Sequence, residues 1–508
     1  MSNLRKVLYV LLTAAILISA SLPLFAAQSD TPKDTITVAS GADPKSLDPY
    51  GTTDSPAGRV ASQIFETLVE RDDAGNIVPA LAESWEVKDP TTYVFRIRRG
   101  VKFHNGEELT AKDVKFSFDK MSSSPHASSV TGTIDFVNSK VIDDHTFEMK
   151  MSEPFGPILN HLCHGVMAIV NEKGYTESGS AVNEKPIGTG PYKFVSWKTA
   201  DSVTLTKFDG YWGEKAKVTN LVFRTIPEAA SRVIEVETGG VDVALQVPPS
   251  AVSRLGQNKD VKIETQETFT TNFLAFTCSK APMDNVKLRQ AINMAIDINA
   301  IQKVVFRGIG MAAVAPIGPS IKGSSRDLPP HEYDPEKAKK LLSEAGYPNG
   351  LKLTLTSDEN QERLDVAEMV QAQLAEIGVD LEVITLERGK FIDDVIAGNL
   401  QMFALGWTTN TGDPDYALYA SFHTSMFGEG GNMSFYSNPK VDELLTKGRI
   451  STDEETRMEA YNEAQKIIWE EVPCVFYLHP QEITAYSASL KNFNSAPDGR
   501  SDFERMYF

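Results

Sequence analysis

The stretch LQMFALGWTTNTGDPDY, residues 400–416, decides the fold and supplies the first candidate site. Met402 to Leu405 form a short apolar run, which is typical of a buried strand. The run ends at Gly406-Trp407 and passes into a polar loop without Lys or Arg. Open α/β sheets bind ligands at the carboxyl ends of their core strands. The stretch therefore predicts a core strand followed by a ligand-binding loop.

The loop is rich in oxygen and amide groups. Residues 408–411 supply hydroxyls and an amide, and Asp413 and Asp415 flank Pro414, whose fixed φ stiffens the turn. An ammonium about 4 Å from a carboxylate gains about 4 kcal/mol at an effective dielectric of about 20, before desolvation. We expect the loop to line a cleft for a small ligand with an amino group. The alternative is a solvated turn whose Asp residues cap the next helix.

Upstream of this stretch, strands and helices alternate. Asp334 caps a helix that has Pro335 at its first position and stops at Gly346. Strands follow at 351–355 and 379–383, and the helices between the strands end at Gly378 and Gly398. This order predicts a parallel sheet with right-handed crossovers.

The remaining segments give further expected elements. Strands are expected at 36–40 and 475–478, and a half-buried strand is expected through Tyr93, Phe95 and Ile97. One helix is expected to open at Pro56, with Val60, Ile64 and Leu68 on one face. Two further helices are expected, one capped by Thr110 and Asp113 and one begun by Thr452 with Glu455.

Composition excludes some partners. The chain has 508 residues, enough for two to four domains, with 50 Lys and Arg against 68 Asp and Glu. Because nothing supplies a basic stripe, we expect no nucleic-acid partner.

The amino end indicates export. Arg5 and Lys6 precede the apolar run 7–18, and small residues follow at Ala26 and Ala27, so 1–27 is predicted to be a signal peptide. Its removal would change the net charge from -18 to -20. No Cys stands at the cleavage point to carry a lipid. We expect a soluble, unanchored protein, periplasmic in a two-membrane bacterium.

Catalytic and metal-binding patterns are sparse. The sequence contains no GxSxG, HExxH or GxxxxGK[ST] motif, so we expect no enzyme. His161, Cys163 and His164 form the only tight group of metal-ligand types, but neighbouring side chains point apart, and we expect neither metal nor cofactor. Cys163, Cys278 and Cys474 are expected to be buried thiols, with one disulfide at most.

Several long motifs carry a family resemblance. They are the stretch 81–121, SLDPY at 46–50, IGTGPYKF at 187–194, FDGYWG at 208–213, DNVKLRQAINMAID at 284–297, YDPEKAKKLLSEAGYPNG at 333–350, AEMVQAQLAEIGV at 367–379 and GWTTNTGDPDY at 406–416. Together they resemble the bacterial extracellular solute-binding proteins of family 5, which feed peptide, glutathione and nickel ABC importers.

The resemblance implies an α/β, two-lobed periplasmic binding protein fold of type II, with an extra subdomain in the first lobe and a hinge between the lobes. Lobe I would comprise 28–270 and 480–508, with the inserted subdomain at roughly 55–185, and lobe II would comprise 271–479.

The sequence departs from the family at two anchors. Peptide binders of the family hold the ligand amino group with an Asp three residues beyond the Trp, where this chain has Asn410. The Arg that dipeptide binders place before the helix at 361–377 is also missing, since this segment reads TSDENQ. The loop, YSNPKVDELL at 436–445 and AQKIIWEEVP at 464–473 look closer to glutathione-binding members.

We expect ligand contacts from Asn272, Trp407, Thr408, Asn410, Thr411, Asp413, Asp415 and Tyr416. Asp413 or Asp415 would replace the missing charge. Core packing remains an alternative for Trp407 and Tyr416, and a helix cap for Asp415.

The implied function is the substrate-binding component of an ABC importer for short peptides or glutathione-like γ-peptides. A monomer would capture its ligand by hinge closure and deliver it to permease subunits in the inner membrane. The alternatives are another small solute, namely a nickel complex, haem or an oligosaccharide, or a secreted peptidase.

Overall fold

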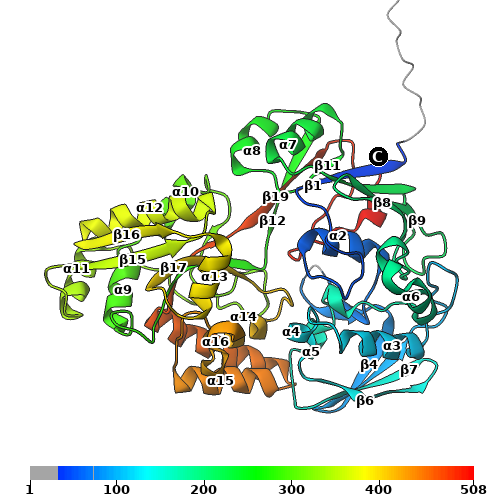
Figure 1. Ribbon diagram of the computed structural model, residues 1–508, viewed down its shortest axis with the longest axis horizontal. Helices are drawn as coiled ribbons and strands as arrows, with labels where there is room; N and C mark the ends of the chain where they lie inside the picture. Colours follow the sequence, from blue (N-terminus) through cyan, green and yellow to red (C-terminus); the bar gives the residue numbers. More distant parts are fainter. Residues whose placement is uncertain (1–32, 73) are drawn as a thin grey trace, which may run out of the picture. The chain divides into compact units, whose positions relative to one another are not determined.

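The computed structural model describes residues 33–72 and 74–508, and the predicted signal peptide lies outside the described residues. Residues Thr35–Tyr507 form one compact unit of mixed helices and strands (Figure 1). Two large sheets and one smaller antiparallel sheet organise this unit. Among the described residues, no helix combines the length and the apolar character that crossing a membrane requires.

The first large sheet has seven strands in the order β12-β19-β11-β1-β10-β9-β8. They are β1 (Thr35–Ser40), β8 (Tyr192–Lys198), β9 (Ser202–Lys207), β10 (Asn220–Thr225), β11 (Val243–Ala244), β12 (Val261–Glu267) and β19 (Gln481–Ser487). β1 runs parallel to both neighbours, β10 and β11, and confirms the strand expected at 36–40. β19 comes from the end of the chain and pairs antiparallel with β11 and β12.

The second large sheet has six strands in the order β14-β18-β13-β17-β15-β16. They are β13 (Thr270–Phe276), β14 (Met311–Ala312), β15 (Leu351–Ser357), β16 (Val379–Thr385), β17 (Met402–Thr408) and β18 (Cys474–His479). The predicted parallel pairing is confirmed for β15 with β16 and β17. β13 and β18 add antiparallel pairing, so the sheet is mixed.

β17 shows why the run that opened the sequence analysis is apolar throughout. Met402 and Ala404 belong to one hydrophobic core, and Phe403 and Leu405 belong to another on the opposite face. Successive side chains of a strand point to opposite faces, so a strand covered on both sides needs apolar residues at every position. Each large apolar side chain buried here contributes roughly 1.5–3 kcal/mol.

Helices of the second sheet contribute to these two cores. Those of the Met402 core are α9 (Val286–Met294), α10 (Ile298–Val304), α11 (Pro335–Glu344) and α12 (Gln361–Glu376). Those of the Phe403 core are α13 (Arg388–Ile396), α14 (Pro414–Phe422), α15 (Pro439–Ile450) and α16 (Glu454–Glu471).

Helix ends follow local chemistry, with two differences from prediction. Asp334 caps α11 as expected, since its side chain accepts a hydrogen bond from the backbone N–H of Lys337. α16 is capped by Asp453 and not by Thr452, because the Asp453 carboxylate reaches the N–H of Thr456. α2 (Ser55–Ile64) ends before Leu68, because Phe65 turns to an extended backbone.

The smaller sheet lies in the segment predicted as an inserted subdomain. It has the order β4-β5-β7-β6, from β4 (Ala82–Asp89), β5 (Thr92–Ile97), β6 (Ile134–Asp143) and β7 (Thr146–Met151). The capping box of Thr110 and Asp113 opens α3 (Ala111–Met121), as predicted. β5 differs from its half-buried prediction, because it is a central strand and all its residues except Arg96 are buried.

The chain passes from the seven-stranded to the six-stranded sheet between β12 and β13, and returns between β18 and β19. The connections are residues 268–269 and Pro480. The lobe boundaries expected at 270/271 and 479/480 fall beside these connections and stay a prediction.

Candidate functional site

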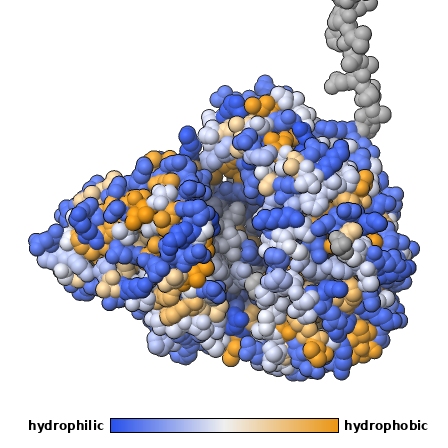
Figure 2. Space-filling model, in the orientation of Figure 1, coloured by the Kyte–Doolittle hydropathy of each residue, from blue (hydrophilic) through white to orange (hydrophobic). Residues whose placement is uncertain are grey.

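A cavity of about 390 Å³ lies where the connections between the two large sheets meet the loop after β17. Its wall comes from the loop before α2, most of α2 itself, β2 (Val69–Arg71) and parts of the segments 163–168, 268–270, 408–411 and 497–504. Figure 2 shows the surface hollowed between the part that carries α13 and α14 and the part that carries α2. The volume lies within the range of small-molecule sites in proteins, about 300–1,000 Å³.

The cavity wall is strongly charged and mainly acidic. Its carboxylate residues are Asp48, Asp54, Glu66, Glu70, Glu482, Asp498, Asp502 and Glu504, and its guanidinium residues are Arg59, Arg71 and Arg500. Arg59 pairs with Glu482 at 2.6 Å, and Arg500 pairs with Asp498 at 2.7 Å. Since acids outnumber arginines, the wall keeps an excess of negative charge that favours a ligand with a cationic group.

Glu66 is held by two aromatic hydrogen-bond donors. Its carboxylate accepts hydrogen bonds from the Tyr211 hydroxyl at 3.0 Å and from the Trp212 indole Nε1–H at 2.9 Å. Both donors belong to the FDGYWG motif, and Arg98 lies 4.5 Å from the Trp212 ring centroid. Burial raises the pKa of Glu66 to about 7, against the lowering effect of these hydrogen bonds. Glu66 is therefore a carboxyl whose charge depends on pH near neutrality.

The loop after β17 reaches the cavity with only part of its predicted residues. Thr408, Asn410 and Thr411 line the cavity. Asn272, Trp407 and Tyr416 are not among its lining residues: Asn272 lies opposite Gly406 in the β13–β17 ladder, and the Trp407 and Tyr416 rings pack 5.9 Å apart. Trp407 and Tyr416 therefore pack against each other, which agrees with the alternative that they are packing residues.

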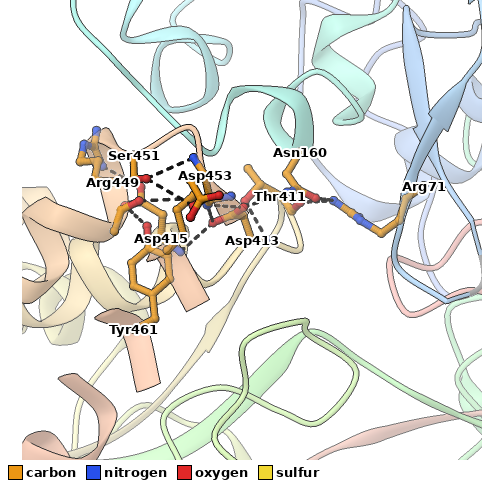
Figure 3. Close-up of polar contacts among 11 residues, drawn as sticks. Arg71, Asn160, Thr411, Asp413, Asp415, Arg449, Ser451, Asp453 and Tyr461 are labelled. Carbon is orange, nitrogen blue, oxygen red and sulfur yellow. Dashed lines mark hydrogen bonds and ion pairs between the residues drawn. The ribbon is translucent and has the colours of Figure 1, made fainter. Parts of the chain in front are cut away.

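The expectation that Asp413 presents a free charge to the cavity is wrong. Its carboxylate is fully buried, receives both hydrogen bonds of Arg457 Nη2 at 2.7 Å and accepts another from the Asn160 amide at 2.8 Å (Figure 3). It also caps α14 through the N–H of Asp415. Burial alone would raise the pKa of Asp413, but Arg457 holds it below its usual range.

Asp415 is likewise turned into the protein. Its carboxylate accepts hydrogen bonds from Arg449 at 2.7 Å and from the Tyr461 hydroxyl at 3.1 Å, and burial raises its pKa to about 6. Asp415 does not line the cavity. The two aspartates therefore join the loop to α15 and α16, and the acidic wall of the cavity comes from other segments.

The group 161–164 divides between cavity and core. Cys163 and His164 line the cavity, whereas His161 is buried against Phe155, with ring centroids 4.8 Å apart. In the part of the chain that the structure describes, no three His, Cys, Asp or Glu side chains gather as a metal site. All three cysteines are free thiols, and Cys278 is only partly buried.

Sequence reasoning missed the cavity residues that lie outside the loop after β17, foremost Glu66 and Arg71. Arg71 ends β2 and touches Thr411, which lies 340 positions further along the chain. The FDGYWG motif was a usable signal for Glu66, because buried Tyr and Trp need partners for their polar atoms. Nothing in the local sequence signals Arg71.

Comparison with known proteins identifies relatives that are binding proteins. Residues 76–429 match the family model described as bacterial extracellular solute-binding proteins, family 5 middle. The chain is 32% identical over 482 residues to the glutathione-binding protein GsiB of Pectobacterium atrosepticum, covering 93% of each chain.

Two solved structures share the fold. HbpA2 of Haemophilus parasuis matches with a TM-score of 0.86 at 27% identity, covering 93% of this chain and 99% of that one. The periplasmic binding protein DppA of Helicobacter pylori, in complex with the peptide STSA, matches with a TM-score of 0.77 at 29% identity, covering 93% and 98%.

Proposed function

Because the chain belongs to the bacterial extracellular solute-binding proteins, family 5, we propose that it captures short peptides, including glutathione-like γ-peptides, for an ABC importer. Its fold is the two-lobed type II fold of the periplasmic binding proteins that it matches. The ligand would lie in the 390 Å³ cavity and pass unchanged to permease subunits of the inner membrane. The protein would act as a periplasmic monomer.

The charge pattern of the cavity is the observation that carries this proposal. A short peptide has one ammonium and at least one carboxylate, and the wall offers an excess of acids together with three arginines. Among the wall acids, Glu66 is fixed by Tyr211 and Trp212, so we assign the ligand ammonium to it. Thr408, Asn410 and Thr411 would add contacts from the loop. A carboxylate close to an ammonium selects zwitterions without reading their side chains.

Closure about the two connections between the large sheets would trap the ligand. Contacts between segments that precede β13 and the loop after β17 support this mechanism, namely Arg71 with Thr411 at the cavity wall and Asn160 with Asp413 outside it. With boundaries at 270/271 and 479/480, each of these contacts joins the two lobes.

The test is calorimetric titration of the purified mature protein with reduced and oxidised glutathione, Ala-Ala and Ala-Ala-Ala, with free alanine as the control. We expect one-to-one binding of at least one peptide. Ligand at about 100 times its Kd should add roughly 2.7 kcal/mol to the free energy of unfolding. Failure to bind every peptide of the panel would overturn the proposal, and hydrolysis of a bound peptide would favour the peptidase.

A further inference from the structure

Arg71 differs from the other two arginines of the cavity. Arg59 and Arg500 are each neutralised by a carboxylate, Glu482 and Asp498. In residues 33–72 and 74–508, no ion pair joins Arg71 to an Asp or Glu. Asp498 feels its charge, since Arg71 adds to the lowering of the Asp498 pKa against the opposing effect of burial, but the hydrogen bonds of Asp498 go to Arg500.

The Arg71 guanidinium is held in place by neutral groups. Its Nη2 donates to the Asn160 side-chain oxygen at 3.1 Å and to the Thr411 carbonyl (Figure 3). The guanidinium lies 5.6 Å from the Phe269 ring centroid. Gly412 packs against it on the loop side, where a Cβ would come 2.7 Å from Cζ. Groups from Asn160, Phe269 and the loop after β17 thus fix one cation at the cavity wall.

One buried polar atom of this group is left without a partner. Both hydrogen bonds of the guanidinium leave from Nη2, and the Nε–H is buried with no acceptor among the described residues. A buried donor without an acceptor is unfavourable, and a guanidinium binds a carboxylate through two parallel N–H···O bonds. The unpaired charge and the unpaired donor of Arg71 therefore both indicate that a carboxylate partner is missing.

We propose that Arg71 binds a carboxylate of the peptide ligand. The inference rests on the proposed function, because it assigns one group of the ligand captured there. Arg71 would take the place of the arginine that is absent from the segment TSDENQ at 356–361. Since Nη2 also holds the Thr411 carbonyl, carboxylate binding would favour contact between the loop and β2.

The test pairs two changes, one in the protein and one in the ligand. Glutathione is titrated into wild type and Arg71→Gln, and so are two analogues in which the glycine or the glutamyl α-carboxylate is an amide. If wild type binds only a simple peptide, Ala-Ala and its C-terminal amide replace them. Arg254→Gln, an exposed residue of α8 (Pro249–Leu255) paired with Glu237, is the control.

We expect Arg71→Gln to weaken binding of the acid at least about 30-fold, and binding of one amide less than about 3-fold. Arg71→Lys should fall between, since it keeps the charge but loses the fork geometry. Unchanged binding of the acid by Arg71→Gln overturns the inference and leaves the proposed function intact. An equal loss for the acid and every amide also overturns it, because Arg71 would then act only through Thr411 and Asn160. If wild type binds no peptide, the proposed function fails and the inference falls with it.

Discussion

Glu66 combines a raised pKa with fixed hydrogen-bond donors. A carboxyl whose pKa rises from its ordinary value of 4.5 to about 7 on folding contributes stability that is fully present below pH 4.5. That stability is lost as the pH rises through 7. The folded protein without ligand is therefore destabilised by ionised Glu66 at pH 8, and a bound ammonium would offset this cost.

Glu66→Gln should accordingly stabilise the ligand-free protein at pH 8 by on the order of 1–2 kcal/mol and leave it nearly unchanged at pH 5. Urea denaturation at the two pH values measures the difference. Glu336→Gln, with a solvent-exposed carboxylate, is the control and should show no such pH dependence. The same stability gain at both pH values would contradict the assigned pKa.

Peptide binding should respond in the opposite direction. Affinity should rise between pH 6 and pH 8 in wild type, because the ionised carboxylate is the form that binds an ammonium. The rise should be smaller in Glu66→Gln, where Glu504, whose pKa burial also raises to about 7, is left in the wall.

At the scale of single residues, sequence identified Asp413 and Asp415 as special but not their partners. Asp413 does cap α14, as expected from the alternative in which the Asp residues of the loop cap the next helix. The partners Arg457 and Arg449 lie 44 and 34 positions downstream, beyond the reach of local pattern. An acidic loop without Lys or Arg has no counter-charge nearby in sequence, but arginines from two other helices, α15 and α16, neutralise it in the folded protein.

At the scale of elements, the buried pair of Asp413 and Arg457 ties the amino end of α14 to α16. Removing one charge of a buried pair leaves the other without compensation, which costs about 3–5 kcal/mol. Asn is also a good helix cap, so Asp413→Asn removes the charge while keeping the cap.

We therefore expect Asp413→Asn to lower the free energy of unfolding by about 3 kcal/mol or more. Asp453→Asn at the exposed cap of α16 is the matched control and should change it by less than about 0.5 kcal/mol. Urea denaturation measures both variants. A stable Asp413→Asn protein that no longer binds peptide would restore Asp413 as a ligand residue.

Helices and strands were predicted correctly where residues nearby in sequence determine them. α11 has its cap, its proline and its glycine stop within 13 residues, 334–346, and forms as predicted. The parallel strands β15, β16 and β17 follow from their alternation with helices. The antiparallel strands β13 and β18 were not placed in this sheet, because they come from sequence about 75 residues before β15 and about 65 after β17.

At the scale of the whole molecule, the segment around α5 (Ile158–His161) meets the helices of the second sheet. The Gly156 N–H donates to the Arg449 carbonyl at 2.7 Å, and a Cβ at Gly156 would collide with the Ser451 carbonyl and the Arg457 side chain. Only glycine allows the two backbones to come this close. Gly156 is far in sequence from the two connections between the large sheets.

Gly156→Ala should weaken peptide binding about 10-fold or more, because the added methyl would prevent this contact when the protein closes on its ligand. Calorimetric titration measures the affinity. Gly132→Ala is the control, since a Cβ there meets only the Ser128 carbonyl at 3.4 Å. Equal affinity of Gly156→Ala and wild type would show that the contact takes no part in closure.

The ordered motifs anticipated the fold of the whole molecule, whereas the cavity wall was largely unforeseen. Many of its residues come from α2, β2 and the final segment 497–504, which share no motif and meet only after folding.

Cys163 gives the cavity one more property. Its thiol lines the wall, and burial raises its pKa to about 11, so only about one molecule in 10⁴ carries a thiolate at pH 7. Because the thiolate is the form that attacks a disulfide, this sulfur is almost inert toward exchange. A carrier built in this way would exchange only slowly with a disulfide compound held beside its own cysteine.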